Sequence, residues 1–266
     1  MTTIAHILDT KRSKTWFLIG VALALVGYWG PWVNHKTAAL ALSGLDMAEF
    51  VKFLPGVRAG AEFMIRELFY LPPLAAALCL ALIGSNRLWR YPLWARMTMV
   101  MTAIVLAIIV LPPYPFILQA LDSDGFRRQF LMAAGCLAVI GGTLLYRRLP
   151  RAVVAGLLIV VSLAGAIPAL WQFFYIRSAL DGVYGQPIHI GWGLWLTVAG
   201  FLIVAGSGGW ILGIGYWRLE GSPGQQAWTV ASYRDKIGVK RESHVDKREI
   251  KRRPDNGQRN QKHSRR

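Results

Sequence analysis

The amino-acid sequence predicts an all-α integral membrane protein, a polytopic six-helix bundle whose two termini both lie in the cytoplasm. Three observations lead to this prediction. Apolar residues make up 54% of the chain, and its mean hydropathy is +0.38. Only 17% of the residues are charged, whereas soluble domains have about 25%. The 30 Lys and Arg residues are concentrated in alternate segments between the apolar stretches, as the positive-inside rule describes.

Six apolar stretches are each long enough to cross a hydrocarbon core of about 30 Å as a helix. They lie near residues 15–33, 61–84, 97–118, 129–146, 152–174 and 188–217. If the first segment is cytoplasmic, the cytoplasmic segments hold 23 basic and seven acidic residues, and the outer loops hold seven of each. We therefore expect a cytoplasmic segment over 1–14, a transmembrane domain over 15–217 and a cytoplasmic tail over 218–266.

The first stretch resembles a signal peptide in its basic start, because Lys11, Arg12 and Lys14 precede it. Trp16 and Trp29 flank it, however, and no small-x-small cleavage site follows directly. Aromatic residues at both ends are typical of a helix that is retained in the membrane. We therefore expect it to be the first span.

The outer loop after the first stretch predicts an amphipathic helix between helices one and two. Ser43 and Asp46 have the spacing of a capping box. The apolar residues that follow recur at helical spacing on one face: Met47, Phe50, Val51 and Leu54. This helix is expected either on the outer membrane surface or folded over the mouth of the bundle.

Ionisable residues enter the second stretch at its outer end: Glu62, Arg66 and Glu67. Glu62 and Arg66 have the i, i+4 spacing of a helical ion pair. One interpretation is that these side chains pair with one another and reach the outer interface. The other is a polar outer vestibule that handles an ion or solute, because ionisable groups inside membrane helices often mark a pathway.

Prolines interrupt three of the stretches, and each removes a backbone hydrogen-bond donor. They are Pro72 and Pro73 in the second, Pro112, Pro113 and Pro115 in the third, and Pro168 in the fifth. We expect the helices to bend or splay there. Such breaks expose backbone in transporters, but neighbouring helices also repair them in proteins that transport nothing.

Small residues predict where helices pack closely. One face of the fourth stretch carries Ala134, Ala138 and Gly142, and one face of the sixth carries Ala205, Gly209 and Gly213. Small residues repeated every fourth position allow two helix backbones to approach.

Few residues suggest chemistry. His35 and His189 are expected on the same side of the membrane, as a pair that binds haem or a metal must be. Asp122 and Asp124 share one outer loop and could chelate a divalent cation. The neighbouring Gly125 makes the second pair a turn more plainly than a site. Cys79 and Cys136 lie inside apolar stretches and are expected to be packing residues. No nucleotide-binding, dinucleotide-binding or zinc-protease motif is present, and no cofactor or metal is expected.

The tail is polar and basic, so we expect it to be disordered apart from a possible helix. Its basic runs are expected to contact anionic lipids of the inner leaflet: Lys240, Arg241, Lys247, Arg248, Lys251, Arg252 and Arg253. Nucleic acid is the less favoured partner, because no aromatic residues alternate with these charges.

The sequence favours a multi-pass protein of the cell membrane that acts as a non-enzymatic structural or accessory subunit of a membrane assembly. Its expected partners are the lipid bilayer and other membrane subunits. The first alternative is a small-solute or ion transporter or channel with an outer polar vestibule. The second is a membrane enzyme that works at the outer face.

Overall fold

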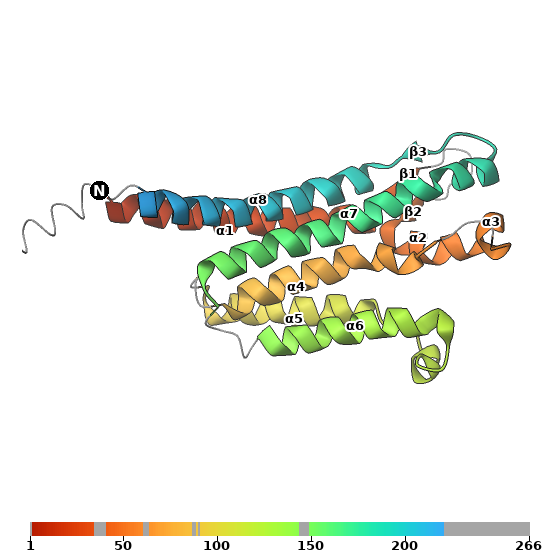
Figure 1. The fold of residues 1–266 in the computed structure, drawn as a ribbon, viewed down its shortest axis with the longest axis horizontal. Coiled ribbons are helices and arrows are strands. Elements are labelled where there is room, and N and C mark those ends of the chain that lie inside the picture. The colour runs from red at the N-terminus through yellow and green to blue at the C-terminus, as the bar shows by residue number, and fades with distance from the viewer. Residues whose placement is uncertain are drawn as a thin grey trace, which may run out of the picture. The chain divides into compact units, whose positions relative to one another are not determined.

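The computed structural model describes residues 2–34, 41–60, 64–86, 89, 91–143 and 149–220. The chain divides into two units, Met1–Gly215 and Tyr216–Arg266. The description below concerns the first unit, which is mostly helical (Figure 1).

Six long helices form the described part of the bundle: α1 (Thr2–Trp29), α4 (Leu71–Ser85), α5 (Leu93–Ile109), α6 (Asp124–Thr143), α7 (Arg151–Tyr184) and α8 (Trp192–Glu220). Shorter helices lie between them: α2 (Gly44–Phe50), η1 (Val51–Phe53), α3 (Pro55–Arg58), η2 (Arg66–Tyr70) and η4 (Phe116–Gln119). Three strands complete the order: β1 (Pro31–Asn34), β2 (Ala41–Ser43) and β3 (His189–Ile190). Each of the six apolar stretches therefore contains one long helix.

Two helices have bounds that differ from the prediction, and prolines account for one of these differences. α5 begins at Leu93 and ends at Ile109, not at 118, because Pro112 and Pro113 lack the N–H groups that would continue the helix. Pro168, by contrast, lies inside α7 without ending it. α7 continues to Tyr184 and stops at Gly185, whose φ of 62° is the left-handed conformation that suits glycine.

A small sheet, which the all-α prediction did not include, joins α1 to α8. Its order is β2-β1-β3, and both pairs are antiparallel. The amide of Gly191 also donates to the carbonyl of Trp32 at 2.7 Å. A Cβ on Gly191 would lie 2.0 Å from the Pro31 carbonyl oxygen, so only glycine fits this approach. We call the end of the bundle that carries this sheet and α2 the sheet end.

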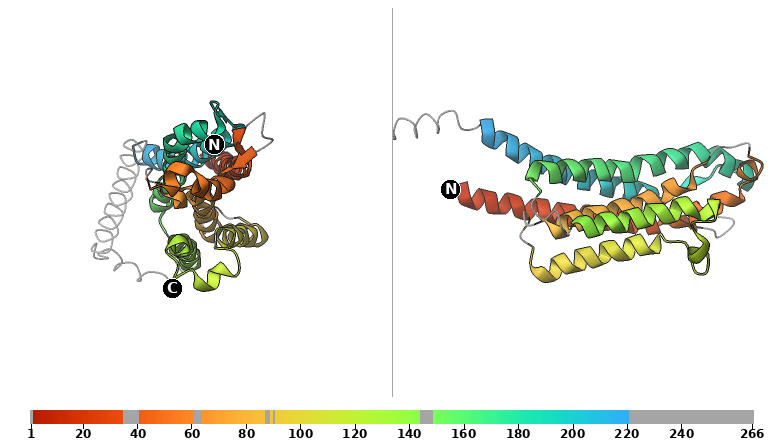
Figure 2. Two further views of the ribbon diagram at one scale, coloured as in Figure 1. Left: turned by 90° about the vertical axis from the view of Figure 1, so that its right-hand side faces the viewer. Right: turned by 60° about the horizontal axis from the view of Figure 1, so that its bottom comes forward.

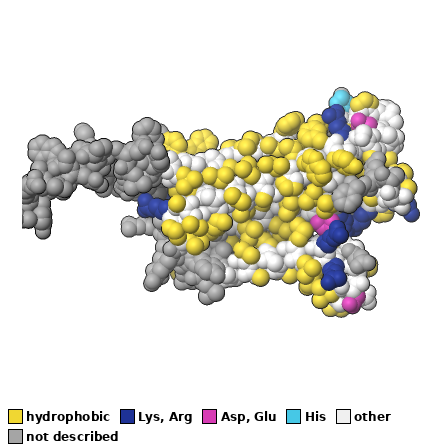
Figure 3. All heavy atoms as spheres, viewed as in Figure 1, with side chains coloured by type: hydrophobic (Ala, Val, Ile, Leu, Met, Phe, Trp, Pro, Cys, Tyr) yellow, Lys and Arg dark blue, Asp and Glu magenta, His cyan; other side chains and the backbone are white. Residues whose placement is uncertain are grey.

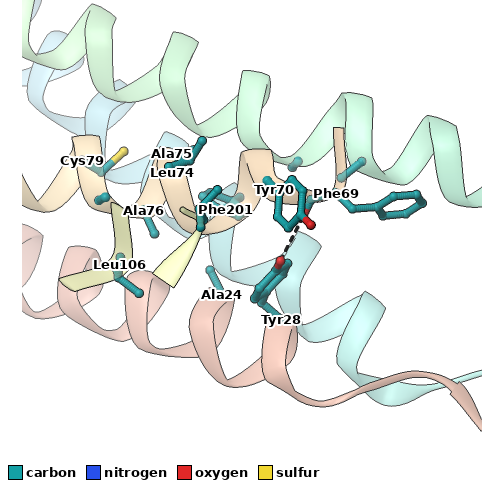
Figure 4. Close-up of a cluster of buried hydrophobic side chains, with 14 of the residues drawn as sticks. Ala24, Tyr28, Phe69, Tyr70, Leu74, Ala75, Ala76, Cys79, Leu106 and Phe201 are labelled. Atoms are coloured by element: carbon teal, nitrogen blue, oxygen red, sulfur yellow. Dashed lines mark hydrogen bonds between the residues drawn. The ribbon is translucent and has the colours of Figure 1, made fainter. Parts of the chain in front are cut away.

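Helix α4 is the centre of the bundle and is buried along nearly its whole length. It packs against α1, α5, α6 and α7. Figures 1 and 2 show α5 and α6 on the opposite side of α4 from α1 and α8. Alanines at 75, 76 and 77 let the neighbours come close (Figure 4). At Gly165 of α7, a Cβ would lie 2.4 Å from the Cβ of Ala75.

Glycines also bring α1 and α8 into backbone contact. A Cβ on Gly27 would lie 2.7 Å from the carbonyl oxygen of Gly193, and a Cβ on Gly20 would lie 2.9 Å from that of Gly200. A Cβ on Gly200 would in turn lie 2.3 Å from the amide nitrogen of Ala24. Close approach over small residues is how membrane helices associate without a hydrophobic driving force. We call this contact the α1–α8 seam.

Large apolar side chains cover the outside of the bundle, whereas the charged side chains seen on this face gather mainly at the sheet end (Figure 3). Among the described residues, three helical segments are long and apolar enough to cross a membrane: Arg66–Ser85, Arg151–Val183 and Trp192–Gly213. Two shorter apolar helices are Ser13–Trp29 and Leu93–Ile109. Exposed tryptophans lie on α1, at Trp16 and Trp29, and on α8, at Trp192, Trp195 and Trp210.

Candidate functional site at the sheet end

Helix α2 has the predicted capping box. The Ser43 amide donates to Oδ2 of Asp46 at 3.0 Å, and the Asp46 amide donates to Oγ of Ser43 at 3.2 Å. These two bonds satisfy amides that the first helical turn cannot use internally. The sequence therefore fixes where α2 begins.

The apolar face of α2 is turned into the bundle. The side chains of Met47 and Val51 are completely buried, and Leu54 is 1% exposed. A Cβ on Gly44 would lie 2.7 Å from the Tyr28 ring and 2.9 Å from the Trp32 ring, so glycine allows α2 to pack against both. Of the two predicted positions for this helix, the structure has the one folded over the end of the bundle.

Arg66 lies under α2 and connects three elements. Its side chain is 10% exposed. Nε donates to Oε1 of the adjacent Glu67 at 3.4 Å, and Nη1 lies 3.7 Å from Oε1 of Glu49 on α2. Nη2 donates to the Gly125 carbonyl and, at 3.4 Å, to Oε1 of Gln129 on α6. The guanidinium is thus held by groups of the chain itself.

Glu49 is the link from α2 to this cluster. Its Oε1 accepts a hydrogen bond from the Tyr70 hydroxyl at 2.8 Å, and its Oε2 pairs with Lys52. Burial pushes the pKa of Glu49 upward, but the hydrogen bonds from Lys52 and Tyr70 and the charges of Lys52 and Arg66 outweigh it. The pKa of Glu49 therefore lies below its ordinary value of 4.5. The carboxylate stays ionised and holds α2 against η2.

Phe126 of α6 supports the cations. The guanidinium carbon of Arg66 lies 5.3 Å from its ring centroid, and Nζ of Lys52 lies 5.4 Å from it. Phe116 stacks on the same ring with centroids 5.2 Å apart. Both cations are within the range of a cation–π interaction. We call Glu49, Lys52, Arg66, Glu67, Tyr70, Phe126 and Gln129 the polar cluster.

The polar cluster contains two of the three residues predicted for the vestibule. Glu62 lies outside the described residues. The second helix begins at Arg66 and not at 61, since Met64 and Ile65 are not helical. Glu62 and Arg66 are therefore not joined by one continuous helix, and the described partners of Arg66 are Glu67 and Glu49. The partners from α2 and α6 were not predicted, because nothing in the local sequence indicates which distant segment covers Arg66.

A hollow on the surface of the bundle lies away from the polar cluster. It has a volume of about 500 Å³ and is lined by Leu25, Val26, Trp29, Gly30, Pro31 and Trp192. Its lining is apolar and includes no residue of the polar cluster.

The other candidate groups do not come together in the described part of the chain. His189 is exposed on β3, and His35 lies outside the described residues. Asp122 is exposed in its loop, and Asp124 begins α6. Among the residues that the structure describes, His, Cys, Asp and Glu form no group of three that could hold a metal ion. Cys79 and Cys136 are buried free thiols.

The small-residue faces predicted on α6 and α8 are not the most buried faces of these helices in the described part of the chain. On α6 the buried residues are Ala133, Cys136 and Ile140, whereas Ala134 and Gly142 are half-buried and Ala138 is exposed. On α8, Ala205 is half-buried, and no atom of the described residues lies within 4 Å of a Cβ built on Gly209 or Gly213. The packed glycines of α8 are Gly193, Gly200 and Gly208. The sequence does contain a signal for two of these glycines. Gly20 and Gly27 are seven residues apart in α1, and Gly193 and Gly200 are seven residues apart in α8.

At the opposite end of the bundle, a second arginine has a role that sequence reasoning missed. Nε of Arg96 donates to the Gly84 carbonyl at 2.8 Å, and Nη2 donates to the Ser85 carbonyl at 3.1 Å. These are carbonyls at the C-terminus of α4, which has no internal donors for them. Nearby, Trp89 and Tyr91 stack with centroids 6.3 Å apart, and Nζ of Lys14 lies 4.9 Å from the Tyr91 ring centroid.

The basic residues of the tail that were predicted to bind lipid lie outside the described residues. The function of the chain must therefore be argued from the polar cluster and from the apolar surface of the bundle. Comparison of the chain with protein-family models, with curated proteins and with solved structures finds no match.

Proposed function

We propose that this chain crosses the cell membrane six times, with both termini in the cytoplasm, and serves as a non-enzymatic structural or accessory subunit of a membrane assembly. The apolar outer faces of α1, α5, α7 and α8 support the membrane location. The concentration of basic residues in alternate segments supports the orientation, with the sheet end outside.

The main support for a structural role is that the charged groups of the polar cluster bind one another. Every nitrogen of the Arg66 guanidinium has a partner within the chain. Glu49 and Glu67 balance Arg66 and Lys52, so the described charges of the cluster cancel. A cluster of this kind joins α2, η2 and α6 and leaves little unused capacity for a solute.

A transporter or channel is the second candidate, and one observation favours it. Arg66 and Glu67 are both buried within an apolar bundle, and ionisable residues at such depth often belong to an ion or proton pathway. On this hypothesis the cluster would open when α2 moves away from η2.

The tail adds a proposed contact with anionic lipids of the inner leaflet. The residues concerned are Lys240, Arg241, Lys247, Arg248, Lys251, Arg252 and Arg253. Each basic residue near such a surface contributes about 1 kcal/mol. A peptide of residues 218–266 should therefore bind anionic vesicles, and added salt should release it. Equal binding to neutral vesicles would contradict this contact.

The topology can be tested with reporters. A reporter fused after Glu220 should be active only in the cytoplasm, and one inserted at Ser123 only outside. The reverse pattern would contradict the proposed orientation.

The functional class can be tested by purifying the full chain in a mild detergent after cross-linking in the native membrane. The structural proposal predicts a complex of defined mass that contains a second membrane protein or further copies of this chain. Proteoliposomes of the purified chain should show no ion flux above that of empty vesicles. A flux that is lost in Glu67→Gln, with no stable complex, would instead support the transporter.

A further inference from the structure

The segment between α5 and α6 exposes an unusual amount of apolar surface. No charged residue occurs from Val110 to Leu121. Tyr114 is 80% exposed, Leu118 75%, Leu121 57% and Phe116 50%. In Figure 1 this segment forms the connection between α5 and α6 at the sheet end. We call residues 113–121 the apolar loop.

The exposure is costly if water surrounds the loop. Apolar surface in contact with water is unfavourable by about 25 cal/mol per Å². Single exposed apolar side chains are ordinary, but a contiguous group of large ones marks a surface that contacts something apolar. The loop therefore requires an apolar neighbour that the described residues of the chain do not supply.

Lipid is the neighbour that fits the position of the loop. Helix α5 leads directly into it and exposes large apolar side chains along its length: Leu93, Trp94, Met97, Met101, Val105, Ile108 and Ile109. The exposed face of α5 and the loop form one continuous stretch of chain. If α5 faces hydrocarbon, the loop lies at the boundary between acyl chains and headgroups.

The charges next to the loop suit lipid headgroups. Arg127 and Arg128 are exposed in the first turns of α6, close in sequence to the end of the loop. Asp122 is also exposed there. Cations beside a group of aromatic and aliphatic side chains are typical of segments that lie in the membrane interface, where the cations contact phosphate groups. Tyrosine is also common at this depth.

We propose that the apolar loop is a membrane anchor that inserts into the lipid interface at the sheet end. Tyr114, Phe116, Leu118 and Leu121 enter the acyl boundary, and Arg127 and Arg128 contact lipid phosphates. The proposal rests on the proposed membrane location of α5 and adds a lipid-binding surface to it.

The depth of the loop can be measured with a spin label on the full chain. Leu118→Cys is labelled in a Cys79→Ala, Cys136→Ala background and reconstituted in vesicles of phosphatidylcholine and phosphatidylglycerol. Val105→Cys, on the exposed face of α5, is the lipid control, and Gln186→Cys, in an exposed loop, is the water control. Collision rates with oxygen and with a water-soluble nickel chelate are compared at each site.

At Leu118 we expect oxygen collisions to exceed nickel collisions, as at Val105, with the reverse at Gln186. A water-like result at Leu118 with a lipid-like result at Val105 would overturn the anchor and leave the membrane location intact. Water-like results at both sites would overturn the membrane location itself. Low collision rates with both reagents at Leu118 would assign the loop to a protein contact and also overturn the anchor.

A second measurement leaves both cysteines in place. A photo-crosslinking amino acid at position 118 of the otherwise unchanged chain should give lipid adducts, and adducts to protein alone would overturn the anchor. Replacing Arg127 and Arg128 by glutamine should make the Leu118 label shallower in vesicles that contain phosphatidylglycerol. An unchanged depth would remove the two arginines from the proposal.

Discussion

An arginine lies at each end of helix α4, and the two arginines contact different kinds of group. Arg66, at the sheet end, meets two carboxylates, a side-chain amide and a carbonyl in a largely buried cluster. Arg96, at the opposite end, donates to two carbonyls of the last helical turn. One arginine balances negative charges, and the other satisfies uncharged backbone groups.

The stability lost on removing an arginine therefore depends on which partner groups are left without it. Without Arg66, the carboxylate of Glu67 stays buried without a described counter-charge. Without Arg96, two carbonyls lose hydrogen-bond donors but no charge is left over. A buried unpaired charge is more destabilising than an unpaired carbonyl.

The largest effect is therefore expected from Arg66→Leu. Removing one partner of a buried ion pair costs about 3 to 5 kcal/mol. The melting temperature in detergent should fall far more than for Arg58→Leu, a matched change at the end of α3, where the side chain has no described ion pair. Equal melting temperatures for the two variants would contradict the buried pair.

The double variant Arg66→Leu, Glu67→Leu separates charge from packing. Removing both charges avoids the uncompensated carboxylate, so it should be more stable than Arg66→Leu alone. If the double variant is instead the less stable one, the cost of Arg66→Leu does not come from Glu67.

A smaller loss is expected from Arg96→Leu. It leaves the Gly84 and Ser85 carbonyls without these donors, at a cost of about 1 to 3 kcal/mol. Arg151→Leu, at the exposed start of α7, is the matched control. Chemical-denaturant or thermal unfolding in detergent should rank the variants as Arg66→Leu, then Arg96→Leu, then the control. A larger loss of stability in Arg96→Leu than in Arg66→Leu would contradict the proposed difference between the two arginines.

Glu49→Gln should have a modest effect that depends on pH. The folded-state pKa of Glu49 is lowered, so its ionised form stabilises the fold above the ordinary pKa of 4.5, and this contribution is lost as the pH falls through the folded value. The side chain is 54% exposed, so we expect less than about 1 kcal/mol near neutral pH.

The wild type should therefore lose stability more steeply than Glu49→Gln over the acid range, from the ordinary pKa of 4.5 downward. Thermal melts of both proteins across this range measure the difference. Parallel pH profiles would show that Glu49 does not hold α2 through its charge.

The smallest effect is expected from Tyr91→Phe, at the opposite end. The Tyr91 hydroxyl is buried, and the described structure gives it no hydrogen-bond partner. Burial raises its pKa to about 12, so it stays neutral. Removing it should leave the melting temperature unchanged or slightly raised. A clear loss of stability would show that this hydroxyl has a hydrogen-bond partner. The stability effects of substitutions at the two ends of α4 would then be more alike.

Local signals in the sequence predicted local structure well. Ser43 and Asp46 predicted the start of α2, because a capping box involves only neighbouring residues. Each apolar stretch contains a long helix. Pro112 and Pro113 predicted a disturbance after the third helix, although the helix ends there rather than bends.

Features that depend on distant residues were predicted less well. The partners of Arg66 come from α2 and α6, and β1 pairs with strands that follow it both closely and distantly along the chain. The small-residue spacing on α8 selected Gly209 and Gly213, whereas the opposing glycines of α1 meet Gly193 and Gly200. A helix with glycines on more than one face does not reveal by itself which face packs.

The α1–α8 seam has a consequence for biosynthesis. Among the described long helices, the one that carries the glycines at 20 and 27 leaves the ribosome before all the others, and the one that carries their partners leaves after them. Until α8 has been made, the backbone of α1 lacks the helix that covers it, so the nascent bundle stays open along one side. Closure of the chain on itself is then a late step, and during this interval a membrane chaperone or another nascent helix could occupy the uncovered surface of α1.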